Sequence, residues 1–223
     1  MILIFDLDDT LYDERSFVLS GLLCVAQHGS QEFGLDPEAS FSFMKQVLEH
    51  EGRGSIFDRW LAQHGIANRK RVAACVKIYR HHHPNITLPS AHREMLHRLQ
   101  LLYPLYLVTD GHKVAQQRKV EALGVGTFFR RVFITHRFGI AHAKPSLYCF
   151  ERIKQAEGVD WPQLLYVGDN PSKDFVNLNK VGAVTVRIHT GIHAQAVVET
   201  EFDATHHIDR LSDFETLLAH ITD

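Results

Sequence analysis

The chain has 223 residues, of which 45% are hydrophobic, and this content is sufficient to bury a real core. Lys and Arg together number 24 against 26 Asp and Glu, so no strong basic field favours nucleic acid or an anionic membrane as a partner. These values argue against a disordered chain and predict a folded protein with neither a nucleic-acid nor a membrane partner.

The first predicted element is a short strand, Ile2 to Phe5. The run is apolar without alternation, as expected for a strand buried on both faces of a parallel sheet. Acids at Asp6, Asp8 and Asp9 interrupt this apolar start, so we expect neither a signal peptide nor a membrane span. A soluble cytoplasmic protein is the resulting expectation.

The stretch from about Asp13 to Leu88 contains no convincing strand. Apolar residues at helical spacing predict helices here, and we interpret its aromatic and Met positions as packing between them. These features predict a helical insert, residues 15–87, in the middle of the chain. The four helical groups lie near residues 17–26, 43–48, 56–61 and 72–79.

A run of histidines, His81-His82-His83, precedes Pro84 near the end of the fourth helical group. Adjacent histidines do not share one face of a helix, which argues against a metal site. We therefore predict a solvated helix terminus at this position.

Apolar runs resembling the first strand recur after the insert and are separated by helix-like stretches. This alternation predicts an α/β sheet built from right-handed crossovers. We expect a Rossmann-like three-layer core with a mainly parallel sheet, formed by residues 1–14 and 88–223. The runs are residues 105–108, 132–134, 164–167 and 184–188.

Reactive side chains follow three of these strands. Ligands of open α/β sheets bind at the carboxyl ends of the strands, so these positions are the candidates for chemistry. A Lys-Pro pair, Lys144-Pro145, lies between the second and third of them. The three segments are Asp6-Leu7-Asp8-Asp9-Thr10, Val108-Thr109-Asp110-Gly111, and Gly168-Asp169-Asn170-Pro171 with Asp174 shortly after.

A close cluster of these acids would repel itself unless a hard cation and a lysine neutralised it. Magnesium suits such an oxygen-only site. One carboxylate could then attack a phosphorus atom, and a second could act as acid and base. The Thr109 hydroxyl, the Lys144 ammonium and nearby backbone amides suit the oxygens of a transferring phosphoryl group.

This ordered set resembles the haloacid dehalogenase-like (HAD) superfamily. Phosphatases of that superfamily carry a DxDx[TV] start, a strand-terminal Thr or Ser, a Lys, and a late GDxxxxD segment. The helical stretch after the first motif also looks like the family's first-type (C1) cap domain. The matches, in order, are Asp6 to Thr10, Thr109, Lys144, and Gly168 to Asp174.

The resemblance implies roles for these residues. Asp6 would be the nucleophile, and Asp8 the acid that protonates the leaving oxygen and later activates water. Thr109, Asp110 and Lys144 would bind the phosphate.

The resemblance also implies a magnesium site. Its ligands would be the Asp6 carboxylate, the backbone carbonyl of Asp8 and the Asp169 carboxylate, with Asp174 as a further ligand or a neighbour of the ligands. Candidates for contacting the rest of the substrate are Arg53, His112 and Asn170. For Arg53, which two glycines flank, a surface turn is the favoured interpretation.

The function that follows is a magnesium-dependent phosphomonoesterase acting on a small phosphorylated metabolite, such as a sugar phosphate or a nucleotide. Asp8 favours a phosphatase over a dehalogenase, because a halide leaving group needs no proton. A phosphomutase with the same core is an alternative, and a receiver-like signalling module is a non-enzymatic one. We expect a monomer or a homodimer.

Overall fold

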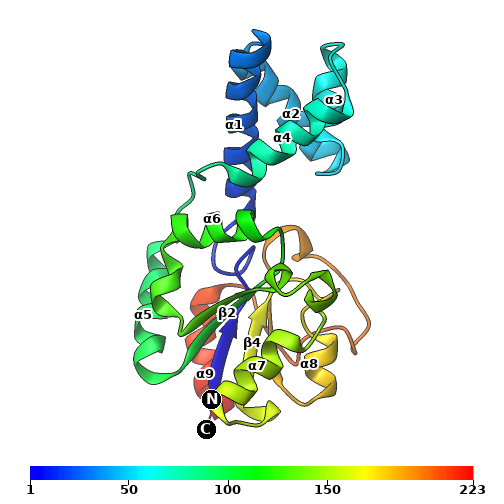
Figure 1. The fold of residues 1–223 in the computed structure, drawn as a ribbon. Helices are drawn as coiled ribbons and strands as arrows, with labels where there is room; N and C mark the ends of the chain where they lie inside the picture. Colours follow the sequence, from blue (N-terminus) through cyan, green and yellow to red (C-terminus); the bar gives the residue numbers. More distant parts are fainter. Residues whose placement is uncertain (223) are drawn as a thin grey trace. The chain divides into compact units, whose positions relative to one another are not determined.

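The structure is a computed structural model that describes residues 1–222, a part of the chain in which no helix could span a membrane. The chain folds into two compact units, which Figure 1 shows with the chain coloured from its start to its end. The larger unit contains Met1–Glu14 and the described residues from Thr87 to Thr222, and the smaller, helical unit is Arg15–Ile86. We call the larger one the catalytic unit, because the strand ends expected to carry the chemistry lie in it.

The catalytic unit contains a parallel sheet of six strands in the order β3-β2-β1-β4-β5-β6. Its first five strands contain the predicted apolar runs, and the sixth, β6, was not predicted. This strand is only His206–Ile208, and a His-His-Ile segment carries no strand pattern. The strands are β1 Ile2–Phe5, β2 Leu105–Thr109, β3 Arg131–Ile134, β4 Leu164–Gly168, β5 Val184–Ile188 and β6.

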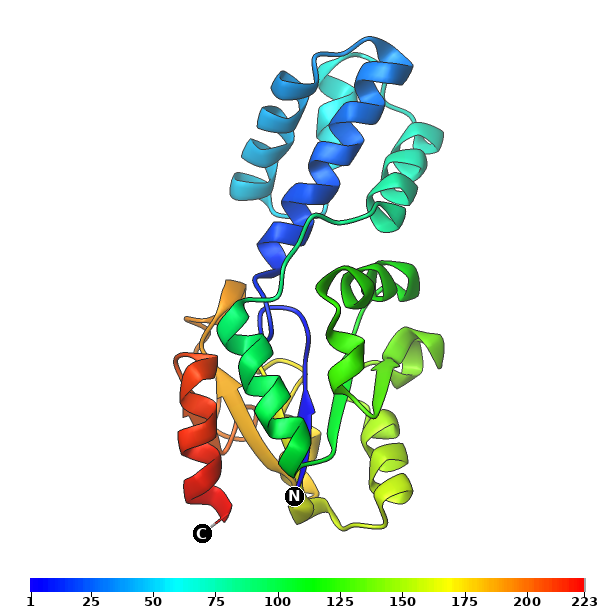
Figure 2. The same ribbon diagram turned by 90° about the vertical axis from the view of Figure 1, so that its left-hand side faces the viewer.

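Helices cover both faces of this sheet (Figure 2). On one face Phe5 of β1 contacts Phe214 of α9, with ring centroids 5.4 Å apart. On the other face Tyr166 of β4 contacts Phe150 of α7, with centroids 5.0 Å apart. The register pairs Phe5 with Val167, the neighbour of Tyr166, so the two contacts lie on opposite faces. The predicted three-layer α/β core is confirmed. Its helices are α5 Ser90–Leu102, α6 Lys113–Leu123, α7 Tyr148–Glu157, α8 Val176–Lys180 and α9 Phe214–Thr222.

The helical unit contains no strand, and each predicted helical group lies in one of its helices. Two of these helices begin at side-chain caps: Asp36 accepts a hydrogen bond from the Ala39 amide, and Asn68 accepts one from the Arg71 amide. Trp60 is fully buried in the apolar core of the unit. The helices are α1 Glu14–Phe33, α2 Pro37–Glu51, α3 Ile56–Gln63 and α4 Arg69–His81.

The histidine run corrects one prediction. Helix α4 ends at His81, as expected, and His83 is exposed, but His82 is buried. The ring of His82 packs against Phe17, with centroids 4.9 Å apart, and its Nδ1 bonds to the carbonyl of Tyr79. The terminus is therefore not fully solvated, because the turn after α4 directs the middle histidine toward α1.

Candidate active site

Three strand ends come together at the carboxyl edge of the sheet. Strand β1 lies between β2 and β4, so the residues that follow these strands become neighbours. Asp6 directly follows β1, and its amide continues the ladder by donating to the Val167 carbonyl at 2.8 Å. Thr109 is the last residue of β2, and Asp169 follows β4. The strand order therefore assembles residues that are far apart in the sequence.

Asp6, Asp169 and Asp174 form a buried carboxylate cluster in which one oxygen of each lies within 4.8 Å of the others. Burial, opposed by Lys144 and reinforced by Asp174, raises the pKa of Asp6 to about 6. Burial and the charges of Asp6 and Asp174 raise the pKa of Asp169 to about 9. Burial is the larger cause of both shifts, and repulsion between the carboxylates adds to it.

The donor set of the carboxylate cluster fits a hard divalent cation. All its donors are oxygens, which are the ligands that magnesium prefers. One of them, Asp6 Oδ1, is buried and has no hydrogen-bond partner among the described residues. A buried acceptor without a donor is costly, and a cation would remove that cost.

Within the described part of the chain, Lys144 is the cation that forms ion pairs with the cluster. Its side chain is 1% exposed, and its Nζ lies 3.0 Å from Asp6 Oδ2 and 2.7 Å from Asp174 Oδ1. It also donates to the hydroxyl of Tyr166 at 2.8 Å. Burial lowers the pKa of Lys144, but Asp174 and Asp6 outweigh it and raise that pKa well above its usual value. The ammonium group is therefore held charged beside Asp6.

Both oxygens of Asp174 have partners within the protein. Oδ1 pairs with Lys144, and Oδ2 accepts the amide of Asn170 at 2.9 Å. A Cβ at position 168 would lie 2.6 Å from Asp174 Oδ2, so this close approach requires Gly168. Asp174 is thus fixed by the turn after β4 and in turn fixes Lys144.

Asp8 lies outside the carboxylate cluster and has its own set of donors. Lys119 Nζ lies 2.8 and 2.9 Å from its two carboxylate oxygens. Gln116 donates to Oδ2 at 2.8 Å, and the Tyr12 hydroxyl donates to Oδ1 at 2.8 Å. We call Tyr12, Gln116 and Lys119 the Asp8 clamp. Burial raises the pKa of Asp8, but the charge and hydrogen bonds of the clamp outweigh burial and hold it below its usual value.

No motif in the sequence indicates the Asp8 clamp or the contact of Tyr166 with Lys144. The available signal was weak: Gln116 and Lys119 stand three residues apart on the helix that follows the Thr109 segment, and so share a face. Nothing in the spacing indicates that this face meets the Asp8 carboxylate.

The Thr109 segment is held from both sides. Thr109 is fully buried, and its hydroxyl accepts a hydrogen bond from Gln116 at 2.5 Å. The Asp110 carboxylate accepts the Lys144 amide at 3.1 Å and the Thr135 hydroxyl. The Asp110 carboxylate acts as an acceptor in both bonds, so the group that Asp110 would offer a phosphate is its backbone amide. Its side chain instead fixes the position of the Lys144 loop.

The remaining candidates lie in three different places. His112 is the half-buried residue that precedes α6, and the Asn170 side chain accepts the amide and hydroxyl of Ser172 in the turn after β4. Arg53 lies in the exposed turn between α2 and α3 of the helical unit, as the favoured interpretation predicted.

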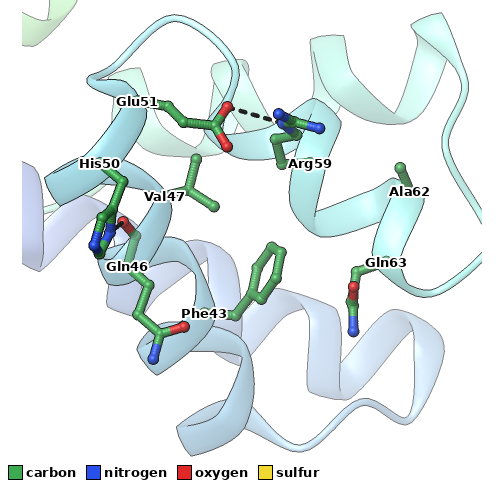
Figure 3. A pocket seen from close by; sticks show the side chains of 8 residues that line it. All are labelled: Phe43, Gln46, Val47, His50, Glu51, Arg59, Ala62 and Gln63. Atoms are coloured by element: carbon green, nitrogen blue, oxygen red, sulfur yellow. Dashed lines mark hydrogen bonds and ion pairs between the residues drawn. The ribbon is translucent and has the colours of Figure 1, made fainter.

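An open groove of about 520 Å³ lies on the helical unit between α2 and α3 (Figure 3). Its charged side chains, Glu51 and Arg59, are paired with each other at 2.8 Å. The groove holds none of the strand-end residues, so it does not compete with the carboxyl edge of the sheet as the catalytic site.

The sequence of the chain matches a known family model over most of its length. The model, described as haloacid dehalogenase-like hydrolase, matches residues 3–188, which include every strand-end residue described above. The chain belongs to the haloacid dehalogenase-like hydrolase family. The match confirms the resemblance to the HAD superfamily from which the expected roles of this HAD hydrolase were taken.

Named relatives of this HAD hydrolase include glyceraldehyde 3-phosphate phosphatases of two archaea. The enzyme of Methanopyrus kandleri is 29% identical over 199 residues, covering 84% of this chain and 83% of the relative. The enzyme of Methanocaldococcus jannaschii is 27% identical over 195 residues, covering 85% of each. Among solved structures, a magnesium-bound HAD hydrolase from Bacillus subtilis matches with a TM-score of 0.72 and 18% identity over 97% of each chain. This likeness confirms the predicted fold.

Proposed function

We propose that this HAD hydrolase cleaves small phosphate monoesters through a phosphoaspartate on Asp6. One observation carries the proposal: Asp6 has a buried oxygen without a hydrogen-bond partner among residues 1–222, beside the Lys144 ammonium, while a second carboxylate, Asp8, follows two residues later. The named phosphatase activity of the curated relatives supports the same reaction class.

The reaction divides into two displacements. An oxygen of Asp6 attacks phosphorus, the bond from phosphorus to the ester oxygen breaks, and Asp8 gives that oxygen a proton, releasing the alcohol. Because the clamp lowers the pKa of Asp8, the carboxylate first takes up this proton from the monoanionic phosphate ester as the substrate binds. Water then attacks the same phosphorus and returns a proton to Asp8, and the phosphorus bond to Asp6 breaks. The sum is ester plus water giving alcohol plus inorganic phosphate, with both carboxyl groups restored.

Lys144 and the Thr109 segment are the proposed phosphate-binding groups. The Lys144 ammonium is fixed by Asp174 and Tyr166, so it needs little reorganisation when charge develops on the phosphoryl oxygens. The Thr109 hydroxyl and the backbone amide of Asp110 would supply further donors.

The carboxylate cluster would hold magnesium. We assign Asp6 and Asp169 as carboxylate ligands and the Asp8 backbone carbonyl as a third, with Asp174 as a further ligand or a neighbour of the ligands. When bound, the cation would offset the repulsion between the carboxylates and the phosphate.

Asp8 favours a phosphatase over a dehalogenase, since an alkoxide must be protonated as it leaves and a halide need not be. A phosphomutase would use the same side chains and differ in returning the phosphoryl group to its substrate. A receiver-like module is disfavoured, because it places its phosphorylated Asp after a later strand, whereas here the acidic pair follows β1. Measuring free phosphate against isomerised sugar phosphate distinguishes the first two.

For the substrate, we propose a phosphorylated metabolite of the size of a triose phosphate, as in the named relatives. We propose that the helical unit acts as a cap that excludes large substrates and water during attack. In this proposal Arg53, His112 and Asn170 contact the part of the substrate beyond its phosphate.

The decisive experiment is magnesium-dependent release of phosphate from glyceraldehyde 3-phosphate and from a generic ester, by wild type and by Asp6→Asn. The variant keeps the shape of the side chain and removes the nucleophile, so turnover should fall to background. Wild-type turnover in Asp6→Asn would show that another group is the nucleophile. Phosphate release by wild type without any divalent cation would contradict the magnesium assignment.

A further inference from the structure

The Asp8 carboxylate accepts more hydrogen bonds than the pairing of its charge with one ammonium group would require. Lys119 bonds both of its oxygens, and Tyr12 and Gln116 each add one bond, to different oxygens. Donors on both oxygens oppose rotation of the carboxylate about its own axis. The clamp therefore fixes the direction of the carboxylate as well as its place.

The Asp8 clamp also reaches the proposed phosphate-binding segment. Gln116 uses one amide nitrogen to bond both Asp8, at 2.8 Å, and the Thr109 hydroxyl, at 2.5 Å. Gln116 and Lys119 lie on one face of α6, so a single rigid helix positions the acid relative to the phosphate-binding hydroxyl.

A structural role for Lys119 is the competing explanation. Its side chain is only 3% exposed, and it also pairs with Glu14 at 2.8 Å, the first residue of α1. A buried ammonium is costly to desolvate and is retained only where its partners compensate. If Glu14 were the partner that matters, Lys119 would serve the start of α1 and Asp8 would be incidental.

We infer that Lys119, with Gln116 and Tyr12, is a positioning residue that aims the Asp8 carboxylate at the leaving oxygen and, later, at the attacking water. This inference rests on the proposed function. Proton transfer requires a donor within hydrogen-bond distance of the leaving oxygen, and a displacement of about 1 Å can cost about 10²-fold in rate.

The inference predicts a dependence on the leaving group. A p-nitrophenolate leaves phosphorus without a proton, whereas the alkoxide of glycerol phosphate requires one. With enzyme in excess over substrate, alcohol release reports the first displacement alone. Lys119→Met should slow this step about 10²-fold for glycerol phosphate and at most about threefold for p-nitrophenyl phosphate.

Two further variants separate positioning from structure. Glu14→Gln removes the ion pair between Lys119 and Glu14 and leaves the three donors to Asp8 in place. It should therefore leave unchanged the ratio of the glycerol phosphate rate to the p-nitrophenyl phosphate rate. Tyr12→Phe removes only one donor to Asp8 and little volume, so it should lower the ratio even if Lys119→Met folds poorly. Lys180→Met, at an exposed lysine of α8, is the matched control for the substitution itself.

Equal slowing of both esters in Lys119→Met and Tyr12→Phe would overturn the inference, as would a Glu14→Gln variant that reproduces the selective loss. If wild type cleaves neither ester, the proposed function fails, and crystal structures of wild type and Lys119→Met then decide the positioning separately. An Asp8 carboxylate that keeps its place without Lys119 would refute the clamp, and a displaced or disordered one would support it.

Discussion

Replacing Asp169 by asparagine should make the cation-free protein more stable while impairing the enzyme. Asp169 is 5% exposed, and burial with the charges of Asp6 and Asp174 raises its pKa to about 9 from an ordinary value of 3.8. Because the folded-state pKa lies above the unfolded-state value, ionisation of this group at higher pH destabilises the fold. The cost is absent below about pH 4 and increases until about pH 9.

The magnitude follows from the same shift. Neutral pH lies about three units above the ordinary pKa of 3.8, so the folded protein holds a proton that the unfolded chain releases. At about 1.4 kcal/mol per unit, the cost is on the order of 4 kcal/mol. Asp169→Asn removes it, which corresponds to a rise of roughly 10 °C in the melting temperature of the catalytic unit.

The change in the catalytic unit is measured by denaturing the protein in EDTA and monitoring unfolding through hydrogen exchange in peptides from β1 and β4. Repeating it with saturating magnesium should stabilise wild type and leave Asp169→Asn almost unaffected. Turnover of the variant should fall at least about 10²-fold. Asp209→Asn, at an exposed acid, is the control. An Asp169→Asn protein no more stable than wild type in EDTA at neutral pH, or one stabilised equally by magnesium, would refute the charge argument.

Three other predictions concern separate parts of the molecule. Lys144→Met leaves the buried carboxylates without their ammonium, so turnover should fall at least about 10²-fold and the cation-free protein should lose about 3–5 kcal/mol of stability, measured by urea denaturation. Gly29→Ala in α1 would place a Cβ 2.5 Å from the buried ring of Trp60, so it should cost about 1–3 kcal/mol in the helical unit, although alanine normally favours a helix. Tryptophan fluorescence during denaturation measures this loss in a Trp161→Phe background, which keeps Trp60 and removes the tryptophan of the other unit. An unchanged midpoint would contradict the packing argument. Arg53→Ala should raise KM, with little change in kcat, for a phosphate ester that carries a second anionic group beyond its phosphate; an equal KM in both proteins would remove Arg53 from the substrate site.

The sequence alone determined where the candidate catalytic residues lie on the strands, but not which side chains hold them in place. Asp6, Thr109 and Asp169 could be placed at strand ends because strands buried on both faces carry a continuous apolar run that ends where a polar residue follows. The order of the strands then brings these ends together, as the resemblance implied. The helical stretch was equally readable, because a period of 3.6 residues is a local property.

The tertiary structure alone decided which side chains surround Asp8. Tyr12, Gln116 and Lys119 reach its carboxylate from the loop after β1 and from α6, and no local pattern records that the two meet. The burial of His82 against α1 was hidden for the same reason. Local periodicity identifies an element and its apolar face, whereas the partner of a polar side chain depends on contacts between segments distant in sequence, and these exist only once the chain has folded.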